Sequence, residues 1–130
     1  MATVPLILIV DDDKEYREIL ADKLVSKGFA VKVAGDGEEA IALAKKHLPA
    51  LILMDVQLPK KDGISATLDL KQDPHTKDIR IIYITNLGDA SPDITNLNRN
   101  FAKQIGALNY FKKGGELHVL VEQIREILAQ

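Results

Sequence analysis

Three aspartates stand where two apolar stretches of the chain end. Asp11 and Asp12 directly follow residues 6–10, and Asp55 closes residues 51–54. Carboxylates brought together without a matching cluster of arginines are costly to ionise, because like charges at short range raise one another's pKa. A hard divalent cation resolves this, since Mg²⁺ binds carboxylate and carbonyl oxygens and keeps positions open for phosphate oxygens. The aspartates therefore predict a Mg²⁺ site suited to phosphoryl chemistry, with a carboxylate as nucleophile.

Two residues that can donate hydrogen bonds follow two further apolar stretches. Thr85 comes after residues 80–84, and Lys113 comes after residues 109–112. A hydroxyl and an ammonium can both donate to phosphoryl oxygens. Each also has a simpler interpretation, because Thr85 suits a strand as a β-branched residue and a lysine beside Lys112 is most often a solvated charge. Successive side chains of a strand point to opposite faces, so Lys113 can face the site only if Lys112 faces away from it.

Strands and helices alternate along the chain and would position these groups. The apolar stretches predict strands at residues 6–10, 29–34, 51–54, 80–84 and 109–112. Helical spacing predicts helices between Asp13 and Gly28, at 38–47, from about 64 to 72, in a segment ending at Ile105, and at 117–128. This alternation predicts an α/β protein with a doubly wound five-stranded parallel sheet in the order 2-1-3-4-5. The polar strand ends would then share the rim at which such sheets bind ligands.

Four segments follow one another along the chain, namely LILIVDDD, LILMDVQLPKKDG, IIYITN and GALNYFKK. Together they resemble the signature regions of response-regulator receiver domains, which have a flavodoxin-like (βα)5 fold, and the match covers essentially the whole chain. The resemblance implies that Asp55 is the phosphoacceptor. It implies that Asp12 binds Mg²⁺ directly, that Asp11 does so largely through water, and that the backbone carbonyl of Gln57 is a further ligand.

The same resemblance implies a switch and its partners. Thr85 and Lys113 would contact the phosphoryl group, and Tyr110 would be the aromatic residue that reorients with the hydroxyl. Tyr110 is equally well explained as a half-buried aromatic with a solvated hydroxyl. The donor would be a histidine kinase or histidine phosphotransfer protein, and a downstream protein target would bind the face from strand four to helix five.

The sequence departs from the family pattern in three places. Gly114 and Gly115 follow Lys113, where the family usually has proline, and Asn86 stands where it usually has a small residue. The interval from Thr85 to Lys113 is 28 residues, several more than usual. The extra length predicts a specialised partner interface within residues 86–105.

Composition limits the remaining choices. The 130 residues include no linker-like stretch, so a single receiver domain over 1–130 is expected, with no effector domain visible. Lys+Arg total 17 against 19 Asp+Glu, and the basic residues are scattered, which argues against direct nucleic-acid contact or membrane insertion. The chain has no cysteine, which excludes disulfides and fits a cytoplasmic protein. No cofactor beyond Mg²⁺ is expected, because the three histidines share no metal-ligand spacing.

Alternative functions remain open. A phosphorylation-independent receiver-like interaction module would suit the departures at Gly114 and Asn86. A small phosphatase with the same aspartate nucleophile would need a general acid two residues later, and Gln57 stands there. We therefore expect no enzymatic turnover of an external metabolite, only slow self-dephosphorylation.

Overall fold

The elements of this computed structural model follow the predicted pattern closely. The structure describes residues 4–85 and 107–129. The strands are β1 (Leu6–Val10), β2 (Ala30–Ala34), β3 (Leu51–Asp55), β4 (Arg80–Thr85) and β5 (Ala107–Lys112). The helices are α1 (Lys14–Ser26), α2 (Gly37–His47), α3 (Gly63–Gln72) and α5 (Leu117–Leu128). The predicted helix ending at Ile105 and the departure at Asn86 lie outside the described residues.

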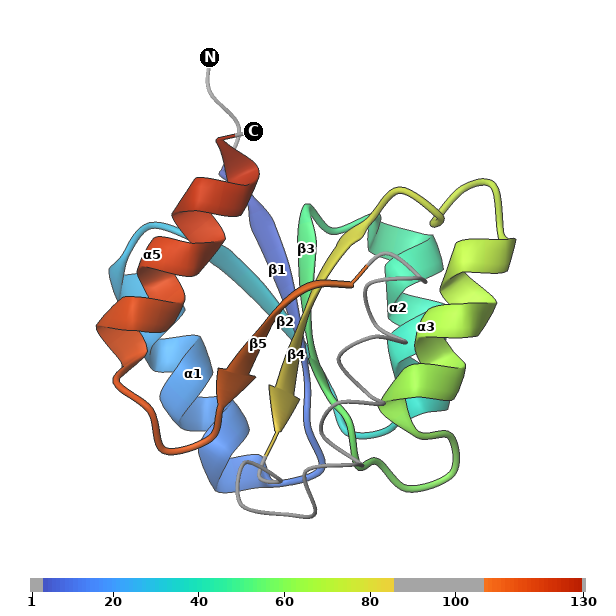
Figure 1. Cartoon of the computed structure of the whole chain (residues 1–130), viewed down its shortest axis with the longest axis horizontal. Helices are drawn as coiled ribbons and strands as arrows, with labels where there is room; N and C mark the ends of the chain where they lie inside the picture. The colour runs from blue at the N-terminus through green and yellow to red at the C-terminus, as the bar shows by residue number, and fades with distance from the viewer. Residues whose placement is uncertain (1–3, 86–106, 130) are drawn as a thin grey trace.

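All five strands run parallel in the order β2-β1-β3-β4-β5, which confirms the predicted doubly wound α/β sheet. Helices α1 and α5 cover one face of this sheet, and α2 and α3 cover the other (Figure 1). Because the strands are parallel, their carboxyl ends meet at one edge, which lies at the bottom of Figure 1. Polar residues at the ends of neighbouring strands are thereby brought close together.

Strands β1 and β3 are apolar up to the aspartates at their carboxyl ends because helices cover both of their faces. Along β3, Ile52 and Met54 pack in the core with α2 and α3, whereas Leu51 and Leu53 pack in the core with α1 and α5. All four side chains are fully buried. Burying each such side chain contributes about 1.5–3 kcal/mol to folding. The two cores fix the strand register, so the strand ends form a rigid platform for the site.

An aspartate is the N-cap residue of three of the helices. Asp13, Asp36 and Asp62 each accept a hydrogen bond from the backbone N–H three residues later, at the start of α1, α2 and α3. Within the run of three aspartates, Asp13 is thus the one that caps α1. Helical spacing groups Ile19 with the apolar residues of α1, but its side chain is 52% exposed.

Candidate functional site

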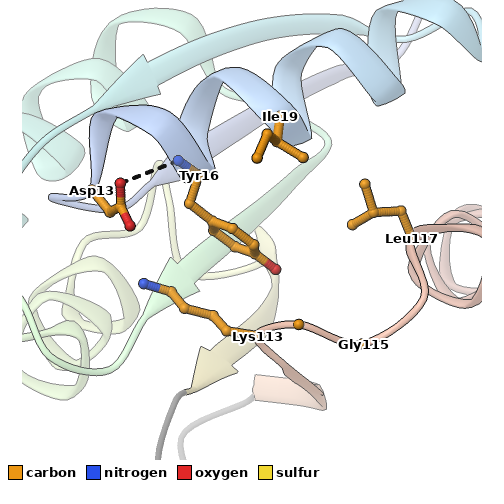
Figure 2. A pocket seen from close by; sticks show the side chains of 7 residues that line it. Asp13, Tyr16, Ile19, Lys113, Gly115 and Leu117 are labelled. Atoms are coloured by element: carbon orange, nitrogen blue, oxygen red, sulfur yellow. Dashed lines mark hydrogen bonds between the residues drawn. The ribbon is translucent and has the colours of Figure 1, made fainter.

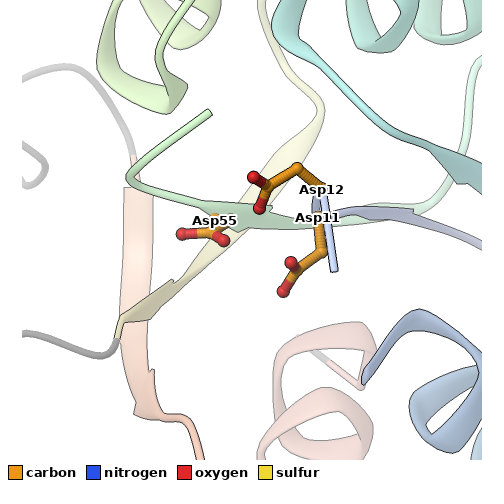
Figure 3. Close-up of side chains that lie close together, drawn as sticks. All are labelled: Asp11, Asp12 and Asp55. Carbon is orange, nitrogen blue, oxygen red and sulfur yellow. The ribbon is translucent and has the colours of Figure 1, made fainter. Parts of the chain in front are cut away.

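Asp11, Asp12 and Asp55 converge at the carboxyl ends of β1 and β3 (Figure 3). One carboxylate oxygen from each residue lies within 4.8 Å of the other two. Asp11 and Asp55 are buried, and Asp12 is exposed. The three aspartates selected from the sequence therefore form one acidic cluster in space.

Backbone contacts hold Asp11 in a fixed orientation. Its N–H donates to the carbonyl of Ala34 at 3.0 Å, and its Oδ1 accepts the N–H of Asp13 at 2.8 Å. Arg17 reaches back from α1 and donates through Nη1 to the carbonyl of Asp11 at 3.0 Å. Its guanidinium also lies over Gly35, where a Cβ would come within 2.8 Å of Nη1. Sequence reasoning missed Arg17, because nothing in a helical spacing indicates a contact with the preceding loop.

Asp55 uses both of its carboxylate oxygens. Oδ1 accepts the backbone N–H of Gln57 at 3.0 Å, and Oδ2 accepts a hydrogen bond from Lys113 Nζ at 3.0 Å. The loop after Asp55 then closes tightly, since the N–H of Gly63 donates to the carbonyl of Val56 at 3.0 Å. A Cβ at Gly63 would lie 2.2 Å from the carbonyl oxygen of Asp55, so only glycine fits there.

Lys113 joins the two buried carboxylates. Its Nζ lies 2.7 Å from Asp11 Oδ2 and 3.0 Å from Asp55 Oδ2, and its side chain is only 10% exposed. Its backbone N–H donates to the carbonyl of Thr85 at 2.9 Å, which ties the residue to the end of β4. Lys112 is exposed, as strand alternation predicts for the neighbour of an inward-facing lysine.

Burial and neighbouring charges shift the pKa values of Asp55 and Lys113 in opposite directions. The pKa of Asp55 is raised from 3.8 to about 6, mainly because burial disfavours the carboxylate, while the hydrogen bonds from Lys113 and Gln57 oppose the rise. Burial would by itself lower the pKa of Lys113, but the carboxylates of Asp11 and Asp55 outweigh it and raise that pKa. Lys113 therefore stays charged, and it offsets only part of the negative charge of the three aspartates.

The remaining predicted site residues lie on the neighbouring strands. Thr85 is the last residue of β4 and pairs in register with Lys112 of β5. Tyr110 is half-buried in β5, and its ring meets that of Tyr83 edge-on with the centroids 5.7 Å apart. The roles of Thr85 and Tyr110 in switching, and of the Gln57 carbonyl in binding metal, stay predictions.

The glycines after Lys113 give the loop a conformation that proline could not adopt. Gly114 has a φ of +87°, whereas the ring of proline fixes φ near −65°. Gly115 lies close to Phe111, whose ring would be 3.2 Å from a Cβ at that position. The departure from the family pattern thus changes the path of the backbone directly after Lys113.

Tyr16 is a second residue that sequence reasoning missed. It lines a hollow of about 480 Å³ between α1 and the loop that follows β5 (Figure 2). Lys113 also lines this hollow beside Tyr16, with its Nζ 5.1 Å from the centroid of the Tyr16 ring. The sequence showed Tyr16 only as one position in a helical spacing.

Fold and site together define a doubly wound α/β protein with an acidic pocket at the carboxyl edge of its sheet. The sequence profile of the response regulator receiver domain matches residues 7–125, and the chain belongs to this family. It is thus a receiver domain of the kind found in two-component response regulators. Receiver domains are signalling domains that bind Mg²⁺ at an acidic pocket and interact with histidine kinases and downstream effectors.

Individual relatives agree with this assignment. The chain is 34% identical over 128 residues to the probable transcriptional regulator ycf27 of Guillardia theta, covering 98% of this chain and 47% of that protein. It thus spans about half the length of the curated relatives it matches. A putative response regulator from Chloroflexus aurantiacus J-10-fl superposes with a TM-score of 0.86 at 35% identity, covering 98% of this chain and all of the other.

One solved structure bears on the acidic pocket. The receiver domain of the sensor histidine kinase PA1611 from Pseudomonas aeruginosa PAO1 superposes with a TM-score of 0.85 at 25% identity, covering 98% of this chain and 100% of the other. That protein holds a magnesium ion coordinated in its active site cleft.

Proposed function

We propose that this receiver domain is a phosphorylation-activated switch that accepts a phosphoryl group on Asp55. The donor is the phosphohistidine of a histidine kinase or of a histidine phosphotransfer protein. The observation that supports this most directly is the arrangement around Asp55, whose carboxylate lies beside Asp11 and Asp12 and is hydrogen-bonded to Lys113. A nucleophile, a cation site and a fixed ammonium are the groups that phosphoryl transfer to a carboxylate requires.

The donor set fits Mg²⁺. It consists of carboxylate oxygens, which a hard cation prefers, and the buried ammonium compensates only part of their charge. We propose that Asp11, Asp12, Asp55 and the backbone carbonyl of Gln57 hold the ion. When bound, Mg²⁺ neutralises negative charge that develops on the phosphoryl oxygens.

In the transfer step, an ionised carboxylate oxygen of Asp55 attacks phosphorus. The bond from phosphorus to the imidazole nitrogen breaks, its electron pair passes to that nitrogen, and the histidine leaves as neutral imidazole after taking a proton from water. The ammonium of Lys113 pairs with the phosphoryl oxygens, and the Thr85 hydroxyl donates to one of them. Although burial raises the pKa of Asp55 to about 6, the nucleophile is still mostly ionised at neutral pH.

Phosphorylation then changes a binding face. The movement of Thr85 toward the phosphoryl group lets Tyr110 reorient, and the surface from β4 to α5 shifts between two pre-existing states. A downstream protein target reads this surface. Water later attacks the aspartyl phosphate and releases inorganic phosphate, so the domain resets slowly and turns over no external metabolite.

Partners and location follow from the same proposal. The relatives ycf27 of Guillardia theta and CpxR of Escherichia coli are named as transcriptional regulators, and this chain corresponds to about half of each. That the chain itself makes no direct nucleic-acid contact stays a prediction based on its scattered basic residues. Among the described residues, none of the helices has the length and apolar character that a membrane span requires. We place the domain in the cytoplasm, where a histidine kinase would meet it.

The test is the intact mass of the protein after incubation with acetyl phosphate and Mg²⁺. We expect one phosphoryl adduct in the wild type, none in Asp55→Asn and none after the metal is removed with a chelator. Asp22→Asn is the matched control, because it removes an exposed aspartate of α1 and should leave the adduct unchanged. Absence of the adduct from the wild type would contradict the proposal and favour a phosphorylation-independent interaction module.

A further inference from the structure

Backbone hydrogen bonds from the Lys113 N–H to Thr85 and from the Gly115 N–H to Lys112 fix the main chain around Lys113, but they do not fix its side chain. Gly114 is exposed, and no atom lies within 4 Å of where its Cβ would be. Its φ of +87° is one that glycine adopts without strain, and glycine leaves the backbone more conformational freedom than any other residue. A lysine side chain adds four flexible bonds of its own. Contacts made by the side chain must therefore hold the ammonium in place.

One of these contacts is the ring of Tyr16. Figure 2 shows Tyr16 of α1 beside Lys113, which reaches the hollow from the end of β5. The ammonium nitrogen lies 5.1 Å from the ring centroid. An ammonium within about 6 Å of a ring centroid, over its face, is attracted by the negative charge of the π-system. The ammonium therefore has three neighbours that attract it, namely the carboxylates of Asp11 and Asp55 and the Tyr16 ring.

The hydroxyl of Tyr16 does not explain why a tyrosine stands here. It is buried, and in the described part of the chain the backbone of Gly114 is the one group that approaches it as a hydrogen-bond donor, without reaching full hydrogen-bond geometry. Burial raises the pKa of this hydroxyl although the charge of Lys113 opposes the rise, so the ring stays neutral. A buried hydroxyl with so poorly aligned a partner contributes little. The well-formed interaction at this position is the one made by the face of the ring.

We propose that Tyr16 is a positioning residue, whose ring holds the Lys113 ammonium beside Asp55 and so sets the rate at which Asp55 takes up a phosphoryl group. The part that concerns rate rests on the proposed function. The part that concerns the position of Lys113 does not, because it is a property of the unphosphorylated protein. The two parts can be measured separately.

The position of Lys113 is tested by labelling the folded protein with an amine-reactive reagent and quantifying each lysine by peptide mass spectrometry. Tyr16→Leu keeps an apolar side chain but removes the ring, so we expect Lys113 to label about two- to fivefold faster, as loss of a cation–π contact allows. Tyr16→Phe keeps the ring and should match the wild type. Exposed Lys112 is the internal reference.

Ile19→Ala is the matched control variant. Ile19 lines the same hollow and lies on the same helix as Tyr16, but it offers no ring to the ammonium. We expect it to leave the labelling of Lys113 unchanged. Thermal unfolding followed by circular dichroism establishes that each variant is folded at the labelling temperature. Faster labelling in Ile19→Ala equal to that in Tyr16→Leu would overturn the proposal, because opening the hollow would then be the cause.

The rate of phosphoryl uptake is measured on the same four proteins with acetyl phosphate and Mg²⁺. We expect Tyr16→Leu to be slower by a similar factor, and Tyr16→Phe to restore the wild-type rate. Wild-type labelling in Tyr16→Leu, or faster labelling with an unchanged rate of uptake, overturns the proposal. A wild type that takes up no phosphoryl group overturns the proposed function and the role in rate, while labelling still decides whether Tyr16 holds Lys113.

Discussion

The ammonium of Lys113 donates a hydrogen bond of 3.0 Å to Asp55 Oδ2, although 58 positions separate the two residues. The same ammonium lies 2.7 Å from Asp11 Oδ2, so one cation serves carboxylates from β1 and β3. Both carboxylates are proposed ligands of Mg²⁺. In the unphosphorylated protein, Lys113 and Mg²⁺ therefore compete for the same negative charge.

Removing Lys113 should strengthen the binding of Mg²⁺. In Lys113→Met the two carboxylates lose their nearest positive charge, and we expect the affinity for Mg²⁺ to rise about tenfold at pH 8, well above the pKa of Asp55. Phosphoryl uptake should fall at least about tenfold, because a fixed donor to the transferred group is lost. Isothermal titration calorimetry measures the affinity, with Lys112→Met as the control. Equal or weaker Mg²⁺ binding in Lys113→Met would show that the lysine does not compete with the metal.

The raised pKa of Asp55 makes the stability of the metal-free protein fall as pH rises. With a pKa of about 6 in place of 3.8, folded Asp55 holds a proton that the unfolded chain releases. The loss of stability begins near the lower value, is complete above the higher one, and is on the order of 3 kcal/mol. Asp55→Asn cannot ionise, so its stability relative to the wild type should rise over this interval.

Urea unfolding of both proteins in chelator, at a series of pH values from 4 to 8, measures this difference. Saturating Mg²⁺ favours the ionised carboxylate in the folded protein, lowers its folded-state pKa and should therefore reduce the loss of stability in the wild type. If the stability difference between the wild type and Asp55→Asn does not change with pH, Asp55 does not have a raised pKa.

The acidic cluster was predictable because strand order alone determines it. A strand covered on both faces is apolar along its whole length, so LILIV and LILM identified β1 and β3 directly. The doubly wound order places these strands side by side, and their pairing from Ile7↔Leu51 to Val10↔Met54 brings Asp11 beside Asp55. Alternation required only that Lys112 and Lys113 face opposite ways, and the resemblance to receiver domains selected Lys113 as the lysine that faces the site.

The contacts made by Tyr16 and Arg17 were not predictable in the same way. Both lie in the first turns of α1, and their partners depend on how this helix is rotated against the sheet. Spacing indicates a helical face but does not determine that rotation, as the 52% exposure of Ile19 shows. The cation–π contact additionally needs the path of the loop after Lys113, which Gly114 determines through a positive φ.

Gly63 should be essential for the shape of the acceptor loop. An alanine Cβ at this position would lie 2.2 Å from the carbonyl oxygen of Asp55 and 3.0 Å from Met54 Cγ. Relief of the clash must move the backbone that carries Asp55, so we expect Gly63→Ala to lower the free energy of unfolding by about 3 kcal/mol. Phosphoryl uptake should slow as well. Ser65→Ala, in the same turn of α3, is the control, and similar stability of the two variants would contradict the expectation.

A buried chain of hydroxyls links α3 to β4. Tyr83 is fully buried, and its hydroxyl donates to Thr67 Oγ1 at 2.9 Å. Thr67 Oγ1 in turn donates to the carbonyl of Gly63 at 2.7 Å. The two side chains have unequal roles in this chain. Tyr83 only donates to Thr67, whereas Thr67 accepts from one residue and donates to another.

The two substitutions that remove a hydroxyl, Tyr83→Phe and Thr67→Val, should therefore lower the free energy of unfolding by unequal amounts. In Tyr83→Phe, Thr67 loses one partner but still donates to Gly63, and we expect the free energy of unfolding to fall by about 1 kcal/mol. In Thr67→Val, the Tyr83 hydroxyl is buried without its acceptor, and the Gly63 carbonyl loses a donor. The free energy of unfolding should therefore fall by about 2–3 kcal/mol. The double variant should cost less than the sum, because phenylalanine has no hydroxyl to leave unpaired. Urea unfolding of all four proteins measures the cycle, and equal single costs with strict additivity would show that the two hydroxyls do not interact.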